Sequence, residues 1–230
     1  MANNKPQDSN TQNSIDEVNE TLTGLEQKVQ DNPKVIVWCS LAVAAIIAVI
    51  LIYVYVIREP GKNAANNAIG QADIELLMGN DSIALAKYQQ VAADEGYDGA
   101  NLANLKAATL LYQKGDYEQA LKYLKEYSSS ESIIGASSKS LEGDCYVNLK
   151  KYNEALDCFK QAVKISDNNP HYTPAFLLKE ATVYRELKDY KNEAAIYEQI
   201  DSEYPLYGQE TGIDIKKYLE RAQENANAGA

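Results

Sequence analysis

Side chains that could act as nucleophiles, general bases or metal ligands are few and scattered in this sequence. The single histidine, His171, follows a proline in a polar linker, whereas a zinc site needs three or four converging ligands. Cys39, Cys145 and Cys158 are too few for a disulfide scaffold, and only the fold decides whether Cys145 and Cys158 pair. Gly61-Lys62 lacks the preceding glycine of a phosphate-binding loop, and no zinc-protease helix or GxSxG turn occurs. We therefore predict that the protein is not an enzyme and has no catalytic site, metal or cofactor.

The sequence after residue 58 repeats itself, and this repeat predicts how the remaining functional side chains are arranged. In each unit a small residue is followed four positions later by a large one, as in Ala84 and Tyr88. In the last unit Glu193 stands where the pattern expects alanine. The aligned large residues are separated by 36, 35 and 38 residues, and they are Tyr88, Leu124, Phe159 and Tyr197. Tetratricopeptide repeats (TPR) have units of about 34 residues, each a pair of antiparallel helices.

The alignment resembles that family and implies an all-α, right-handed TPR solenoid of about four helix pairs with a C-terminal capping helix. The cap is expected as one helix from about Gln209 to Asn225. The predicted repeat units are about 64–97, 98–130, 131–170 and 171–207. The whole chain is predicted to comprise a disordered leader at 1–14, an amphipathic helix at 15–33, a transmembrane helix at 34–58, the repeat domain at 59–207, and the cap with a frayed tail at 208–230.

The first helix of each unit is expected to line a concave groove, and its side chains are the candidate protein-binding residues. The candidates mix polar and apolar side chains, which suits an extended or helical peptide segment. TPR receptors for chaperone tails resemble one another in a Lys/Asn/Arg clamp, and Leu105, Ser140 and Leu178 are among its replacements here, which argues against capture of a carboxylate. The alternative is that the groove only packs, and that binding occurs on the convex face or an edge. The nine candidates are Leu105, Thr109, Tyr112, Asp144, Val147, Asn148, Leu178, Thr182 and Arg185.

One segment is apolar enough to cross a membrane. Val35 to Ile57 is a run of 23 residues without a charge, and the hydrocarbon core of a bilayer is about 30 Å thick, which about 20 helical residues span. A buried core helix rarely runs this long, and the apolar core of a signal peptide is only about 7–15 residues. We therefore predict a retained anchor. Two basic residues lie close to each end, so the positive-inside rule does not assign its orientation.

The segment before the anchor carries an apolar stripe at helical spacing. The spacing predicts an amphipathic helix, because its apolar residues recur every three or four positions. Such a stripe favours self-association or partner binding, and the alternative is a loosely formed helix without a partner. The stripe residues are Ile15, Val18, Leu22, Leu25 and Val29.

The charge excludes one class of partner. The chain has 33 acidic and 22 basic residues and a net charge of -11. Binding to phosphates depends on clustered lysine and arginine, so we do not expect a nucleic-acid partner.

The order of these parts resembles the YfgM-type ancillary subunits of the bacterial Sec translocon. A short acidic leader, one span, and a repeat domain ending in Tyr204-Pro205 and Ile215-Lys216-Lys217-Tyr218-Leu219 carry the resemblance. It implies an inner-membrane protein with a cytoplasmic N-terminus and periplasmic repeats. It also implies SecYEG and periplasmic chaperones as partners. The alternative is a scaffold for another envelope assembly, such as one for cell division or outer-membrane biogenesis.

Overall fold

The computed structural model describes residues 33–93, 98–129 and 131–228. In this part of the chain every regular element is a helix and no β-strand occurs, which confirms the predicted all-α class. The chain divides into two compact units, Met1–Pro60 and Gly61–Ala230. The predicted stripe from Ile15 to Val29 lies outside the described residues and stays a prediction.

The described part of the first unit is an apolar helix. It begins as α2 (Pro33–Ile52) and continues as a π-helical segment, η1 (Tyr53–Arg58). Large apolar side chains such as Trp38 and Tyr55 are exposed along it. Ser40 donates a hydrogen bond to the carbonyl oxygen of Val37 at 2.9 Å, which satisfies a polar group in an apolar run. By length and composition this helix can cross a membrane.

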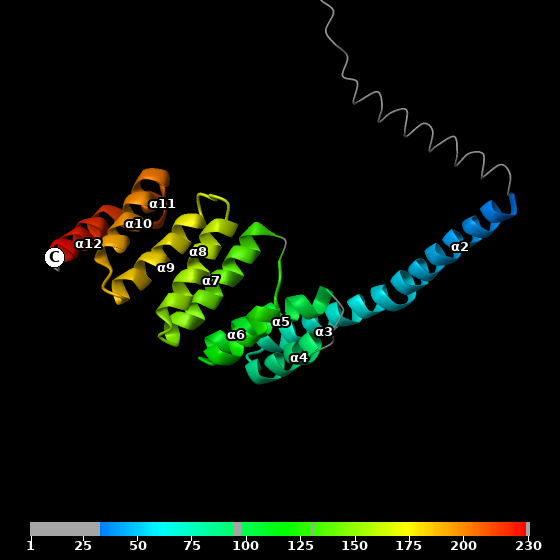
Figure 1. Cartoon of the computed structure of the whole chain (residues 1–230). Helices are drawn as coiled ribbons and strands as arrows, with labels where there is room; N and C mark the ends of the chain where they lie inside the picture. Colours follow the sequence, from blue (N-terminus) through cyan, green and yellow to red (C-terminus); the bar gives the residue numbers. More distant parts are fainter. Residues whose placement is uncertain (1–32, 94–97, 130, 229–230) are drawn as a thin grey trace, which may run out of the picture. The chain divides into compact units, whose positions relative to one another are not determined.

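The second unit consists of antiparallel helix pairs that follow one another along the chain (Figure 1). In the second, third and fourth pairs the first helix packs on the second and also on the second helix of the preceding pair. In the first pair Ala72 of α3 lies in one apolar cluster with Ala84 and Tyr88 of α4. The helices are α3 (Glu59–Leu77), α4 (Asp81–Ala93), α5 (Asp98–Gln113), α6 (Tyr117–Glu126), α7 (Ser132–Asn148), α8 (Tyr152–Ile165), α9 (Thr173–Glu186) and α10 (Tyr190–Glu203).

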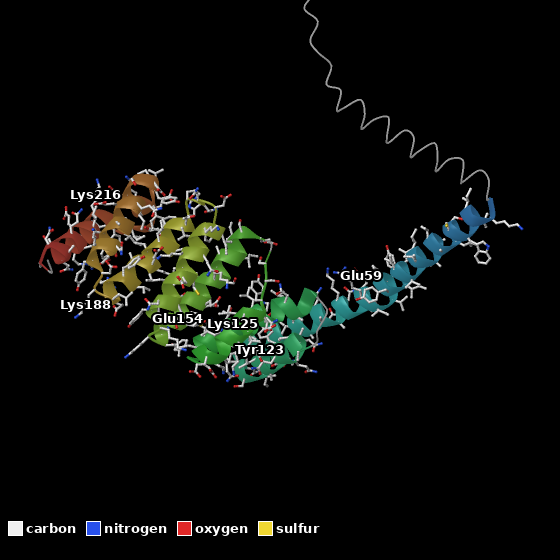
Figure 2. All side chains as sticks on the ribbon, viewed as in Figure 1. Glu59, Tyr123, Lys125, Glu154, Lys188 and Lys216 are labelled. Atoms are coloured by element: carbon white, nitrogen blue, oxygen red, sulfur yellow. The ribbon has the colours of Figure 1, made fainter. Side chains whose placement is uncertain are left out.

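The same tight turn joins the two helices of every pair. After α5, for example, the Gly115 amide donates to the carbonyl of Tyr112 and the Asp116 amide donates to that of Leu111, at 3.0 and 2.9 Å. This is the Schellman arrangement, which requires a left-handed residue. Glycine adopts that conformation readily, whereas a residue with a Cβ is strained there by about 1–2 kcal/mol. The left-handed residues are Gly79 (φ 78°), Gly115 (φ 82°), Lys150 (φ 56°) and Lys188 (φ 60°), the last labelled in Figure 2.

Small residues allow the two helices of each pair to approach closely. They are buried on the first helix of each pair, at Ala72, Ala108, Gly143 and Ala181. A Cβ added to Gly143 would lie 2.6 Å from the ring of Phe159, so α7 can lie this close to α8 only because Gly143 lacks a side chain. In the third pair the small Gly143 on the first helix and the large Phe159 on the second therefore form the contact on which the pair closes.

Glu193 keeps the register of the fourth pair. It lies on α10 four residues before Tyr197, which is buried as Tyr88 and Phe159 are in their own pairs. Its side chain is fully buried, like the alanines at the same position in the other pairs. The substitution of glutamate for alanine therefore changes the chemistry of this position and not the helix register.

The C-terminal end differs from the single helix expected from about Gln209 to Asn225. The structure has a short helix, α11 (Tyr207–Thr211), and then α12 (Ile215–Ala228). Gly212 stops α11 because it adopts the left-handed conformation, with φ 73°. Asp214 then accepts a hydrogen bond from the Lys217 amide at 3.1 Å and begins α12. Ile215 and Ala222 of α12 are buried in one apolar cluster with residues of α9 and α10.

Candidate protein-binding face

We call the surface formed by the first helices of the pairs, α3, α5, α7 and α9, the inner face. The nine candidate residues lie on the last three of these helices, and each is exposed or half-buried. Their exposure leaves them accessible to a partner. Which of them bind one stays a prediction, but the contacts between them show which are already engaged.

Asp144 is held by a lysine from the next helix pair. The Lys179 ammonium of α9 lies 2.5 Å from the Asp144 carboxylate of α7 and donates to the Ser140 hydroxyl at 2.9 Å. It also lies 5.8 Å from the centre of the Phe159 ring, within cation–π range. Burial raises the pKa of Asp144, and the Lys179 charge acts against that rise. Asp144 is therefore largely neutralised inside the protein and is a poor ligand for an incoming cation.

An equivalent arrangement links the first two helix pairs. The Lys106 ammonium of α5 lies 2.9 Å from the Asp73 carboxylate of α3 and 5.8 Å from the centre of the Tyr88 ring. The Tyr88 hydroxyl donates a short hydrogen bond to the same carboxylate. Burial acts to raise the pKa of Asp73, but the hydrogen bonds from Tyr88 and Lys106 outweigh it and leave that pKa lowered. An aspartate, a lysine from the next pair and an aromatic ring therefore recur at two junctions.

The middle of the inner face carries no such pair. Thr109 occupies the aspartate position on α5, and its hydroxyl donates to the Leu105 carbonyl at 2.8 Å. Burial and the Asp144 charge raise the pKa of Tyr112, and Asn148 acts against them through a hydrogen bond. The structure therefore brings the candidates Tyr112, Asp144 and Asn148 together across the junction of α5 and α7.

Arg185 is the cation at the far end of the candidate set. It is half-buried on α9. Burial raises the pKa of Tyr197, and the Arg185 charge is among the effects that act against that rise. Within the described residues no carboxylate forms an ion pair with Arg185. Thr182, one turn before it, donates to the Leu178 carbonyl at 2.9 Å and is thereby engaged with its own helix. An arginine with five donors and no acidic partner can bind an incoming carboxylate.

Sequence reasoning missed the buried glutamates. Glu180 of α9 is 4% exposed, and burial raises its pKa, while the charge of Lys160 and a hydrogen bond with Tyr184 oppose that rise. Glu142 of α7 lies 2.6 Å from Lys139 on the same helix. Both stand at positions equivalent to a buried alanine in α5. A glutamate at an aligned alanine position could have indicated these buried carboxylates. The repeat alignment shows the same signal at Glu193.

The buried Glu193 is paired with the C-terminal helix. Its Oε1 accepts from Nη2 of Arg221 at 2.9 Å, while its Oε2 and the Arg221 Nε are buried without a hydrogen-bond partner. Arg221 lies 5.0 Å from the centre of the Tyr218 ring, which stacks on Tyr197 at 5.7 Å. This cluster fixes α12 to α10 and places charge inside the cap.

The described residues hold no group of three side chains able to bind a metal ion. The cysteines among them are free, and burial raises the pKa of both Cys145 and Cys158 to about 12, so these two thiols are unreactive.

The comparisons with known proteins agree on the fold. A tetratricopeptide repeat-like domain family matches residues 54–180, and a tetratricopeptide repeat family matches residues 175–207. No curated protein matches the sequence. The crystal structure of MamA protein is similar, with a TM-score of 0.53 and 17% identity over 71% of this chain and 92% of that chain. The C-terminal part of a TPR repeat-containing protein from Cytophaga hutchinsonii is similar, with a TM-score of 0.51 and 18% identity over 71% of this chain and 68% of that chain.

At such identities the two structures show the fold alone. The repeats themselves imply a protein-binding adaptor role, and TPR proteins are typically interaction scaffolds and not catalysts. Since the first match spans more than half of the sequence, the chain belongs to the tetratricopeptide repeat-like domain family.

Proposed function

We propose that this protein is a non-enzymatic, membrane-anchored adaptor whose inner face holds a segment of another protein. One observation carries the proposal. Tyr112, Val147 and Arg185 occupy the same position on three successive first helices, and all three are accessible. Asp144 beside Val147 is already paired with Lys179, and Thr109 and Thr182 beside the other two are bonded to their own helices. The accessible row is therefore aromatic, aliphatic and finally cationic.

The row of Tyr112, Val147 and Arg185 indicates which side chains the bound segment carries. An apolar side chain of the segment packs on Tyr112 and Val147, and a carboxylate further along it pairs with Arg185. Arginine binds carboxylates in a bidentate manner, which gives orientation as well as affinity. A single arginine with threonine and leucine beside it is not the clamp of a chaperone-tail receptor, so the segment binds through mixed contacts along its length.

The helix from α2 into η1 is proposed to be the membrane anchor. It is long and apolar enough to span a bilayer, and its exposed aromatic side chains suit the two interfaces. The resemblance to ancillary translocon subunits supports a cytoplasmic N-terminus and periplasmic repeats at the bacterial inner membrane. It also supports SecYEG and periplasmic chaperones as partners. A scaffold for another envelope assembly is the alternative, and co-purification of SecYEG from detergent-solubilised membranes separates the two.

Site-specific photo-crosslinking in native membranes tests the binding face. A photoreactive residue at Val147 of the full chain should form adducts with the partner. The same residue at Asn153, which is exposed on the second helix α8, should not. Arg185→Glu should lower the adduct yield at Val147 at least fivefold, because it repels the carboxylate of the segment. Equal adducts at both positions would place binding on the convex face or an edge.

The burial of the native thiols dictates how the topology is tested. Because Cys145 and Cys158 are buried, we would replace all three native cysteines by alanine and introduce Ser202→Cys, which is exposed on α10. An impermeant maleimide should label this cysteine in intact spheroplasts. Labelling only after lysis would overturn the periplasmic assignment. Release of the chain from membranes at high pH would overturn the anchor itself.

A further inference from the structure

The junction of the first two helix pairs holds a carboxylate in a defined set of contacts. The Asp73 carboxylate of α3 accepts a short hydrogen bond from the Tyr88 hydroxyl of α4 and lies 2.9 Å from the Lys106 ammonium of α5. These three groups come from the first helix of a pair, from its second helix and from the first helix of the next pair. A phenol and a cation thus converge on one negative charge.

The last junction repeats the phenol but has no carboxylate at the aspartate position. Tyr197 of α10 stands at the position of Tyr88, and Thr182 of α9 stands at the position of Asp73. The Thr182 hydroxyl donates to the Leu178 carbonyl of its own helix at 2.9 Å. Among the described residues, the last junction therefore has a phenol without the acidic acceptor that the first junction gives it.

Two arginines lie around this phenol. The next helix, α12, packs on α10 and supplies Arg221, while α9 supplies Arg185. Arg221 lies 5.0 Å from the centre of the Tyr218 ring, which stacks on Tyr197 at 5.7 Å. Burial raises the pKa of Tyr197, and both arginine charges act against that rise. The phenol therefore stays protonated and able to donate, between two cations that repel each other.

The charges of this cluster do not balance within the described residues. Glu193 pairs with Arg221 at 2.9 Å, and no described carboxylate forms an ion pair with Arg185. Two arginines and one glutamate leave one positive charge, whereas Asp73 and Lys106 balance each other at the first junction. The Glu193–Arg221 pair is also incomplete, because the glutamate Oε2 and the arginine Nε are buried without a hydrogen-bond partner. One further carboxylate would neutralise the cluster.

We propose that Arg185, Arg221 and the Tyr197 hydroxyl bind the carboxylate of the segment that occupies the inner face. The carboxylate stands at the last junction as Asp73 stands at the first, where it accepts from the phenol and pairs with a cation of the next helix. Arginine carries five donors in a rigid plane, so two arginines can hold both carboxylate oxygens. The helix α12 is then part of the binding face as well as the cap. The inference rests on the proposed function for the origin of the carboxylate.

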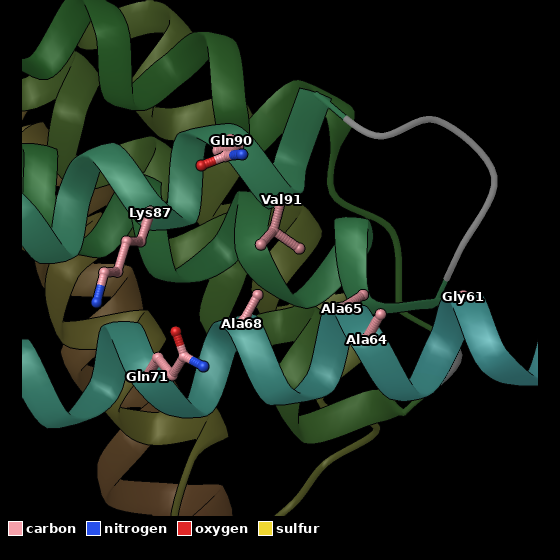
Figure 3. A pocket seen from close by; sticks show the side chains of 8 residues that line it. All are labelled: Gly61, Ala64, Ala65, Ala68, Gln71, Lys87, Gln90 and Val91. Atoms are coloured by element: carbon pink, nitrogen blue, oxygen red, sulfur yellow. The ribbon is translucent and has the colours of Figure 1, made fainter.

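An opening elsewhere in the repeat domain has a cation that is already paired. A hollow of about 430 Å³ lies between α3 and α4, and Figure 3 shows Lys87 projecting from α4 and Gln71 from α3. Lys87 is the charged residue of its described lining, and its ammonium lies 2.9 Å from the Glu75 carboxylate. The charge of this hollow is therefore compensated, which makes Lys87 a suitable control.

Arginine NMR of the full chain in detergent micelles tests the site, with acetate as the carboxylate probe. The chain has three arginines, Arg58, Arg185 and Arg221, so nitrogen-15 arginine labelling gives three Nε–H signals. Acetate should shift the Arg185 and Arg221 signals together, with one dissociation constant. The Arg58 signal should stay in place, because this residue belongs to the other compact unit. Equal shifts with chloride at the same ionic strength would overturn the proposal.

Substitutions separate the contribution of each group. Tyr197→Phe removes only the hydroxyl, and phenylalanine fits because Phe159 is buried at this position in the third pair. It should raise the dissociation constant for acetate at least threefold, whereas Lys87→Met should leave that constant unchanged. Glu193→Ala removes the carboxylate that competes for Arg221, so acetate should bind at least threefold more tightly. A tighter constant in none of these variants and no loss in Tyr197→Phe would overturn the proposal.

The role of Arg221 is tested without leaving a buried glutamate unpaired. Adding Arg221→Met to Glu193→Ala should weaken acetate binding at least tenfold relative to Glu193→Ala alone. Hydrogen exchange in α12 should be equal in the two variants, which shows that the cap is still docked. Equal acetate binding in the two variants would exclude Arg221 from the site and overturn the proposal.

The two proposals fail in different ways. If Arg185→Glu lowers the photo-crosslinks at Val147 while acetate leaves the Arg221 signal in place, the proposed function stands and this inference is wrong. If acetate shifts both arginine signals but Arg185→Glu leaves the crosslinks unchanged, the carboxylate site is supported and its use by the bound segment is overturned.

Discussion

Removing Arg221 should detach the C-terminal helix while leaving the rest of the repeats folded. Arg221→Met keeps an unbranched side chain of similar length but removes the charge that faces Glu193. The Glu193 carboxylate is fully buried, and its hydrogen bond to Arg221 at 2.9 Å is the one that Oε1 has in the described residues. Its Oε2 has none. The substitution would therefore leave a buried charge without a partner.

Breaking a buried ion pair from one side costs about 3–5 kcal/mol. We expect the low end, about 3 kcal/mol, because the Arg221 side chain is 38% exposed and water can enter where it leaves. Glu193→Ala is different, since it removes the buried charge and restores the residue type found at Ala84, Ala120 and Ala155. Replacing a buried charge by a packed apolar residue is often neutral or stabilising, so this change should alter stability by less than about 1 kcal/mol. Adding Glu193→Ala to Arg221→Met should recover most of the loss.

Hydrogen exchange of the full chain in detergent micelles is the suitable assay, because repeat arrays do not unfold in a single two-state step. A loss of about 3 kcal/mol corresponds to roughly a hundredfold faster exchange. It should appear in α12 and the facing part of α10. Lys139→Met is the control, since it breaks the Lys139–Glu142 pair within α7 and should leave exchange in α12 unchanged. Exchange in α12 that changes less than threefold in Arg221→Met would refute the reasoning. So would a double variant as fast as Arg221→Met alone.

Three further predictions concern the repeats. Gly143→Ala should destabilise the third pair by about 1–3 kcal/mol, because its Cβ would overlap the Phe159 ring, whereas Gly70→Ala, with nothing within 4 Å, should not lower the melting temperature. Lys150→Gly should raise the melting temperature. Lys150 has a φ of 56°, and glycine would remove the strain of about 1 kcal/mol that a residue with a Cβ has in this conformation. Glu180 has a raised pKa in the folded state, so its contribution to stability is fully present below its ordinary value of 4.5 and is lost as pH rises through the folded pKa. In urea titrations Glu180→Gln should remove that part of the pH dependence, and an unchanged slope would assign it to another group.

Local sequence features predicted the repeats because each element follows from nearby residues. The small residue and the large residue four positions later recur in each unit, and both act through contacts with neighbouring residues of that unit. The C-terminal helix was predicted less well. Gly212 looked like one residue of a polar helix, although a glycine with positive φ ends a helix. The break follows from Gly212 and from Asp214, which caps the start of α12, so both local signals were present in the sequence.

The binding candidates were predicted as positions but not as chemistry. The alignment placed Asp144 on the inner face, and it does lie there. The alignment did not reveal that Lys179, 35 residues further along the chain, neutralises it. Such a pair joins two repeat units. Its formation depends on how the first helices of adjacent units are positioned along each other, and the sequence of one unit does not determine this. Arg221 was missed for the same reason, because its contact with Glu193 depends on how α12 packs on α10.

The pairing of charges along the inner face alternates with a period of two units. The aspartate position reads Asp73, Thr109, Asp144 and Thr182 in successive pairs. The lysine position of the following pair reads Lys106, Leu141 and Lys179. Aspartate and lysine thus meet at the first and third junctions, and threonine stands opposite leucine at the second.

This alternation places the uncharged part of the inner face at its centre, where Tyr112 meets Asn148. Charges that are paired inside the protein contribute little to binding, because a partner must first compete with the existing bond. A segment that crosses the centre therefore gains most from apolar and amide contacts there. Among the described residues of the inner face, Arg185 is the cation that forms no ion pair with an acidic side chain, so the segment can bind it directly. We therefore expect the proposed binding face to select a segment by the distance between an apolar residue and an acidic one, so that a free carboxylate terminus alone is not enough.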